Sequence, residues 1–146
     1  MEFYERETNL FYIYYQIIKK YKNFMEENLH GYNFTPAEID VITFLINNQD
    51  KNITAKDISE IRGISKGLVS RAVTELRRKN IIKIKENPDD KRSVYLKINN
   101  AEENLIEKVR EKNKFFIEKI VNDIECEDLA LFLKINNKIL TNSKSL

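Results

Sequence analysis

The chain has 146 residues, the length of about one domain, and 42% hydrophobic and 33% charged residues make an ordinary globular composition. One cysteine and one histidine exclude an internal disulfide and a Cys- or His-based zinc cluster, so we expect no metal and no cofactor. The acidic N-terminus (Glu2, Glu5, Glu7) and the lack of a long apolar run argue against a signal peptide and a membrane partner, and cytoplasmic location is expected.

Positive charge is concentrated in the middle of the chain. Residues 62–98 carry eleven Lys and Arg against four Asp and Glu, a net +7, whereas residues 1–61 have a net −4 and residues 99–146 a net −1. A solvated basic face is one interpretation of such a block. The choice between that interpretation and a binding surface depends on how the block folds.

Four helices are predicted before residue 80. Apolar residues at three- and four-residue spacing predict the first over residues 5–28. The second begins at the capping box of Thr35 and Glu38 and ends near residue 47. The third runs from Thr54 to residue 62, and the fourth from Ser65 to residue 79, with Asn80 as a left-handed stop. The apolar residues expected to face inward are Ile58 and Ile61 in the third helix and Leu68, Val69, Ala72, Val73 and Leu76 in the fourth.

Beyond residue 80 the apolar period changes from 3.6 to 2, which predicts two half-buried strands over 82–85 and 93–98. The polar segment 86–92 between them has turn chemistry, so the strands form a hairpin. Helices over 101–124 and 128–140 complete the order α-α-α-α-β-β-α-α. The predicted fold class is mainly α (α+β).

The fourth helix presents a one-sided polar face. At about 100° per residue this face holds four cations and no carboxylate, with Glu75 at its border. Cations suit phosphates, hydroxyls suit phosphates or base edges, and small residues let a backbone approach, so the face favours DNA binding. Its residues, with the N-cap, are Ser65, Lys66, Gly67, Ser70, Arg71, Thr74, Arg77 and Arg78.

The short turn between the third and fourth helices predicts a helix-turn-helix, with the fourth helix as the reader of the major groove. The hairpin is then a wing whose tip carries Lys91 and Arg92. Asp90, two residues before Arg92, can accept hydrogen bonds from the guanidinium and hold it extended toward a minor groove. Taken alone, such an Asp-x-Arg spacing is more often a surface ion pair.

Here the chain resembles the MarR family (multiple-antibiotic-resistance type) of transcriptional regulators. The similarity spans nearly the whole chain, and the Asp-x-Arg wing in register is its most specific element. One departure is Asn80, which stands where the family often has glycine. The matching segments are 35–38, 58–60, 64–73 with Leu76, 80–82, 88–92 and 94–96.

The resemblance implies a homodimeric winged-helix regulator whose first and last two helices form the dimer interface and whose wing arginine enters the minor groove. The wing role falls on Arg92, supported by Asp90. It also implies base and phosphate contacts for Ser65, Lys66, Ser70 and Arg71.

We therefore predict a winged helix-turn-helix with long terminal dimerisation helices. Residues 1–34 and 101–146 form the helical dimerisation region, and residues 35–100 form the DNA-binding lobe. The terminal helices carry more apolar surface than a small lobe can cover, which favours a homodimer over one larger monomeric core.

The expected function is sequence-specific binding of double-stranded DNA by a repressor of transcription. The alternative is a winged-helix module that binds another protein without DNA specificity. The sequence has no Gly-rich phosphate loop and no nucleophile motif, so no enzyme is expected.

Ten of the fifteen aromatic residues lie in residues 1–34. This concentration chiefly indicates packing and interface contacts. A second interpretation is a pocket for a small aromatic effector that releases the protein from DNA. The residues expected to line its pocket are Tyr15, His30, Tyr32 and Phe115.

Overall fold

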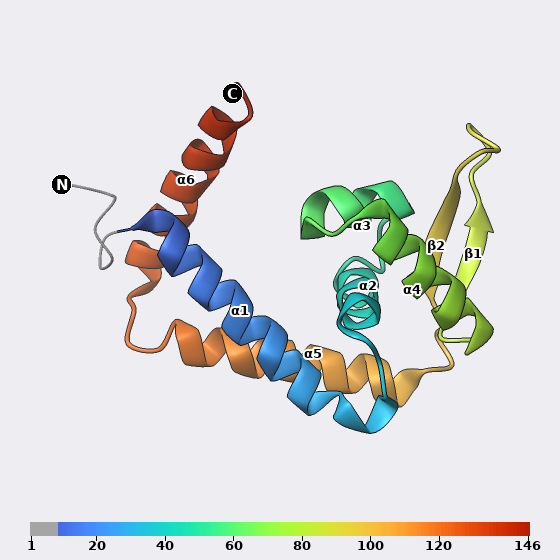
Figure 1. Ribbon diagram of the computed structural model, residues 1–146. Helices are drawn as coiled ribbons and strands as arrows, with labels where there is room; N and C mark the ends of the chain where they lie inside the picture. The colour runs from blue at the N-terminus through green and yellow to red at the C-terminus, as the bar shows by residue number, and fades with distance from the viewer. Residues whose placement is uncertain (1–8) are drawn as a thin grey trace. The chain divides into compact units, whose positions relative to one another are not determined.

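The computed structural model of the protein describes residues 9–146 (Figure 1). The predicted order of elements and the mainly helical winged fold are confirmed, with one added 3-10 turn. The chain divides into two compact units, residues 1–112 and 113–146. No helix in the described part is long and apolar enough to cross a bilayer. The elements are α1 (Leu10–Asn28), η1 (His30–Tyr32), α2 (Pro36–Asn47), α3 (Ala55–Arg62), α4 (Lys66–Arg78), β1 (Ile82–Glu86), β2 (Val94–Ile98), α5 (Glu103–Ile120) and α6 (Cys126–Ser143).

Side-chain caps set the starts of the helices around the wing. The hydroxyl of Thr35 accepts a hydrogen bond from the Glu38 amide at 3.2 Å, and the Glu38 carboxylate accepts one from the Thr35 amide at 3.4 Å. Thr54 and Asp57 form the same capping box at the start of α3. Ser65 caps α4. Because each cap depends on residues three apart, the sequence predicts all three starts.

Left-handed residues end α3 and follow α4. Gly63, the C-cap of α3, has φ 65°, and Asn80, two residues beyond α4, has φ 61°. Only glycine and, less readily, asparagine or aspartate adopt this conformation at low cost. The left-handed stop predicted at Asn80 is confirmed, and the third helix ends at residue 62 as predicted.

The outer helices differ from the predicted ranges. The predicted start of the first helix at Glu5 lies outside the described residues, and Asn9 caps α1. α5 ends at Ile120 instead of near residue 124, because the chain turns there and Asp123 has φ 59°. α6 is longer than predicted and begins at Cys126.

α2 lies at the centre of the first unit. Residues 38–46 of this helix are all buried, which is typical of a helix packed on every side. α1, α3, α4 and β2 all contact it, and the core extends to Leu105 and Val109 near the start of α5. Met25 of α1 and Leu29, the C-cap of that helix, belong to the same core as the winged helix. The predicted division at residues 34 and 100 concerns assembly and remains a prediction.

The predicted burial of two apolar residues is wrong. Ile61 is 68% exposed and Leu68 is 45% exposed, although both were expected inside. Ile61 lies in the last turn of α3, just before the chain turns away at Gly63. Leu68 lies about 70° from the centre of the buried stripe of α4, which Val69, Ala72 and Leu76 form.

The wing is a two-stranded antiparallel sheet that extends beyond the helices of the first unit (Figure 1). Its register places Ile82 opposite Ile98 and Ile84 opposite Leu96. These residues face the core, and Ile53 adds an isolated bridge to Leu96 on the free edge of β2. The root of the wing is therefore fixed to the core, while its tip is free.

Candidate nucleic-acid interface

The predicted binding face of α4 is entirely at the surface. All eight of its residues are exposed, and Val69, Ala72 and Leu76 on the opposite side are buried. α4 packs against α2, α3 and β1, so the helix is held on its apolar side while its basic side faces solvent. The exposed residues are Ser65, Lys66, Gly67, Ser70, Arg71, Thr74, Arg77 and Arg78.

The cations of this face are not equivalent. Lys66, Arg71 and Arg77 form no ion pair with any carboxylate of residues 9–146. Arg78 is different, because its guanidinium donates to the carboxylate of Glu75 from Nη2 at 2.5 Å and from Nε at 3.1 Å. These hydrogen bonds lower the pKa of Glu75 and raise that of Arg78. Three cations are therefore free to meet phosphates or bases, and the fourth is already paired.

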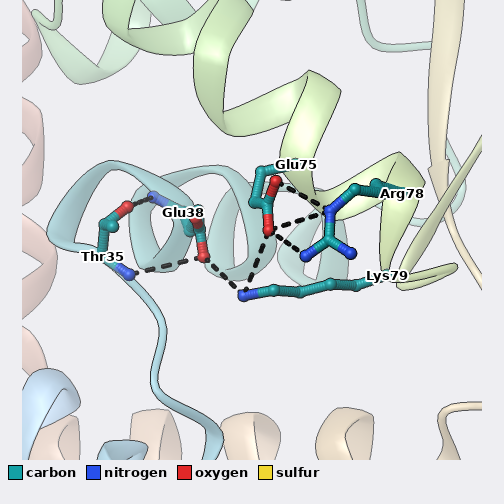
Figure 2. Close-up of polar contacts among 5 residues, drawn as sticks. All are labelled: Thr35, Glu38, Glu75, Arg78 and Lys79. Atoms are coloured by element: carbon teal, nitrogen blue, oxygen red, sulfur yellow. Dashed lines mark hydrogen bonds and ion pairs between the residues drawn. The ribbon is translucent and has the colours of Figure 1, made fainter.

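Figure 2 shows that this pair belongs to a longer chain of contacts. Nζ of Lys79 lies 4.0 Å from the Glu75 carboxylate and 3.6 Å from the buried carboxylate of Glu38 on α2. Glu38 in turn completes the capping box with Thr35. The C-terminal end of α4 is thus tied to the N-terminal end of α2, a link that the sequence analysis missed.

Glu38 is buried without being isolated. Its side chain is 5% exposed, it accepts the Thr35 amide, and it pairs with Lys79, whose ammonium also lies 5.5 Å from the centre of the Phe34 ring. Removing one partner of a buried pair leaves an uncompensated charge, which is costly. This pair therefore holds the orientation of α4 over the core.

At the wing tip, the Asp90 carboxylate has a different donor from the one predicted. Its Oδ1 accepts a hydrogen bond from the backbone amide of Arg92 at 2.9 Å. Among the described residues, the side chains of Asp90 and Arg92 form no ion pair with each other. The predicted clasp of the guanidinium is wrong, because a two-residue spacing closes an Asx turn on the backbone more readily. Asn87 forms the same turn with the amide of Asp89.

The wing tip therefore has a backbone ordered by the Asx turn and two cations without a carboxylate partner in the described part of the chain. Asp90, Lys91 and Arg92 are all exposed, and within residues 9–146 neither cation pairs with a carboxylate. The aspartate orders the backbone, and the arginine side chain remains available for a ligand. The sequence therefore gave the aspartate the wrong partner, and the DNA-binding role of Lys91 and Arg92 stays a prediction.

The four residues predicted for an effector pocket differ in their surroundings. Tyr15 is 61% and Phe115 47% exposed, and His30 is exposed in η1. Tyr32 stacks on Phe34 with 5.3 Å between ring centres. None of the four lines the small cavity between α1 and α2.

That cavity has polar groups at its wall. Tyr21, Asp40 and Thr43 are among its lining residues, and burial raises the pKa of Tyr21. Its volume of about 20 Å³ holds about one water molecule. An aromatic ligand therefore needs α1 to move away from α2 before it can enter.

No group of three His, Cys, Asp or Glu side chains that could hold a metal ion occurs in the part of the chain that the structure describes. The arrangement offers instead a basic helix, a basic wing tip and exposed Leu68 beside them. Such a surface is suited to a polyanion with apolar base edges.

Comparison with known proteins agrees with this geometry. The model of the MarR family matches residues 32–93, which span α2, α3, α4 and the wing up to its tip. No curated protein matches the sequence.

Several solved structures share the fold. A MarR-family transcriptional regulator from Silicibacter pomeroyi has a TM-score of 0.81 at 15% identity, with 94% of this chain and 92% of that chain covered. MepR of S. aureus in its DNA-binding conformation has a TM-score of 0.78 at 18% identity, over 90% of this chain and 96% of that one. The S. aureus MepR–DNA complex has a TM-score of 0.71 at 18% identity, with 92% of this chain and 98% of that chain covered. At these identities the likeness shows the fold.

Proposed function

We propose that this protein is a cytoplasmic transcriptional regulator that binds specific sequences in double-stranded DNA, because the model of the MarR family matches its winged helix. The observation that carries the proposal is the exposed face of α4, on which Lys66, Arg71 and Arg77 have no carboxylate partner among the described residues. Ordinary surface helices mix both signs of charge, so a single-sign face needs an anionic partner.

In this proposal α4 enters the major groove with its N-terminal half toward the bases. Ser65, Lys66 and Gly67 meet the backbone, since a helix start offers free amides and Gly67 has open space around it. Arg71 reaches a guanine edge, for which its planar fork is suited. Leu68, exposed in the first turn, contacts a thymine methyl group, which explains why an apolar side chain faces solvent there.

The wing contributes a second contact. Arg92 enters the adjacent minor groove, where the negative potential is strongest when the groove is narrow. The Asx turn of Asp90 fixes the backbone from which this arginine projects. Lys91 then meets a flanking phosphate.

We further propose that the protein acts as a homodimer through its terminal helices. α1 exposes Phe11, Tyr15 and Ile18, and α6 has no buried residue at all in the single chain, although Leu131 and Leu133 are apolar. Exposed apolar stripes of this size are typical of interfaces. A twofold dimer places two reading helices about 34 Å apart, one turn of DNA.

Repression is the expected outcome, because a dimer that occupies an operator blocks other proteins from the same DNA. A small aromatic effector would relieve it by favouring a different spacing of the two reading helices. Binding between α1 and α2 would widen the cavity near Tyr21. A thermal-shift screen of aromatic acids tests this part: no change in melting temperature with any of them contradicts it.

The whole proposal is tested by selecting bound fragments from sheared genomic DNA with the purified protein, then titrating the selected site against salt. Specific binding predicts one enriched sequence and an affinity that falls by about 0.9 log units per phosphate contact for each log unit of salt. Absence of enrichment, or binding that salt does not weaken, contradicts DNA recognition and favours a protein partner.

A further inference from the structure

The outer face of the wing carries lysines that the proposed interface does not use. In both strands the side chains alternate, so the isoleucines and Leu96 face the core and the residues between them face away from it. On this face the β1 residues are exposed and the β2 residues are half-buried. The outward residues are Lys83 and Lys85 on β1 and Tyr95 and Lys97 on β2.

The register sets two of these charges against each other. Lys83 is directly opposite Lys97, and Lys85 is directly opposite Tyr95. Like charges at directly opposed positions destabilise a sheet. None of the ion pairs of residues 9–146 involves these lysines, and Glu86 belongs to the inner face by alternation. The free protein therefore carries a repulsion that an anion between the two strands would relieve.

One of the two opposed lysines is held in place. Nζ of Lys97 donates to the backbone carbonyl of Lys51, in the loop that precedes the bridge between Ile53 and Leu96. The side chain is half-buried, whereas Lys83 is exposed. An ammonium has three donors, so two remain for a ligand. A fixed cation loses less freedom on binding than a mobile one.

We infer that the outer face of the wing binds the phosphate backbone of the DNA that flanks the site read by α4. The inference rests on the proposed function and extends it. Lys85 and the opposed pair lie along the hairpin whose tip carries Lys91 and Arg92, with about 7 Å between same-face side chains of one strand. A duplex offers a regular line of phosphates that such a track can follow. The phenol of Tyr95 is a further donor beside Lys85.

The test uses the full-length protein and a random-sequence duplex of about 40 base pairs, with binding measured by fluorescence anisotropy between about 50 and 300 mM KCl. Lys83→Gln/Lys97→Gln should lower the affinity and reduce the slope of log K against log salt by about 1 to 2, as expected for one or two phosphate contacts. Its melting temperature should change little, because loss of the like-charge pair offsets loss of the hydrogen bond from Lys97 to the Lys51 carbonyl. Lys83→Arg/Lys97→Arg keeps the charge and should keep the slope.

The matched control is Lys19→Gln/Lys20→Gln, which removes two exposed lysines from α1 and changes the net charge equally. If the wing variant has the affinity and slope of this control, the inference is wrong. Should Arg92→Ala weaken binding in the same assay while the wing variant does not, the proposed function stands and only the outer face is excluded. A wild-type protein that binds no DNA overturns both.

Discussion

Glu75 holds the guanidinium of Arg78 by hydrogen bonds from both Nε and Nη2, one turn along the same helix (Figure 2). Arg78 is therefore on the basic face of α4 but is neutralised there. Because the pKa of Glu75 is lowered by this contact, the carboxylate stays charged as pH falls until it passes below its ordinary value of 4.5. The pair is present throughout the neutral range, and a phosphate has to compete with it.

Glu75→Gln should consequently strengthen DNA binding. The substitution frees Arg78 for a phosphate, so the slope of log K against log salt should increase by about 0.9, the value for one added contact. Lys79 keeps its buried partner Glu38, so α4 should remain in place. Fluorescence anisotropy with a random-sequence duplex measures both quantities.

The control for this prediction lies in the same pair. Arg78→Gln alone should change the slope little, since the arginine is already engaged, and the double variant Glu75→Gln/Arg78→Gln should match Arg78→Gln. A stronger slope in the double variant would mean that the gain comes from lost negative charge alone and that Arg78 has no part in it.

The wing tip gives a prediction that separates the backbone role of Asp90 from a side-chain clasp. Asp90→Asn keeps an oxygen acceptor for the Arg92 amide and should preserve DNA affinity. Asp90→Ala removes the acceptor and should loosen the tip, with a loss approaching that of Arg92→Ala. Mobility-shift titrations of the three variants, with sedimentation equilibrium to confirm unchanged assembly, provide the measurement. Equal losses for asparagine and alanine would instead point to a charge-dependent contact with the guanidinium.

Arg71 and Arg77 face the same side of α4 but should contribute differently. Arg71 lies in the middle of the helix. If its guanidinium binds a guanine with two hydrogen bonds, Arg71→Ala should weaken the free energy of DNA binding by about 1–3 kcal/mol and relax specificity at one base pair. Arg77→Ala, in the last turn, should weaken all sequences equally, as a phosphate contact does. Binding of the selected operator and of single-base variants distinguishes the two. Uniform losses for both variants would leave Arg71 as a phosphate ligand only.

The features that the sequence predicted correctly are local. Thr35, Thr54 and Ser65 cap helices through bonds that span three residues, and Gly63 and Asn80 need only their own backbone angles. Short-range rules of this kind do not depend on the rest of the fold. Alternation in the strands is equally local, which is why the wing was found.

The features that the sequence missed depend on packing between distant segments. The partner of Lys79 is Glu38, more than forty positions away in the sequence, and no sequence pattern predicts that pair. Leu68 lies about 70° from the centre of the buried stripe of α4, and the sequence does not show how wide a stripe the neighbouring helices cover. The pairing of Glu75 with Arg78 is the exception, because a spacing of three on a helix would have predicted it.

Glycines at the start of the reading helix and in the turn before it should respond oppositely to alanine. Gly63 has φ 65° with open space around it, so Gly63→Ala should lower the free energy of unfolding by about 1–2 kcal/mol through backbone strain alone. Gly67 is helical and has equally open space around it, so Gly67→Ala should raise the free energy of unfolding by about 0.5–1 kcal/mol. Denaturant unfolding measures both. If DNA approaches the helix start, Gly67→Ala should also weaken binding despite its greater stability, and unchanged affinity would place the backbone farther away.

The terminal helices should hold two copies of the chain together. Leu133 of α6 is 60% exposed in the single chain, so Leu133→Glu costs the folded monomer little but places a charge where an apolar contact is proposed. We expect the dimer dissociation constant to rise at least about tenfold, equivalent to about 1.4 kcal/mol, as measured by sedimentation equilibrium. Lys134→Glu, at the next exposed position, reverses a charge without touching the apolar stripe and should leave the dimer intact. A wild-type protein that sediments as a monomer at micromolar concentration would remove the dimer from the mechanism.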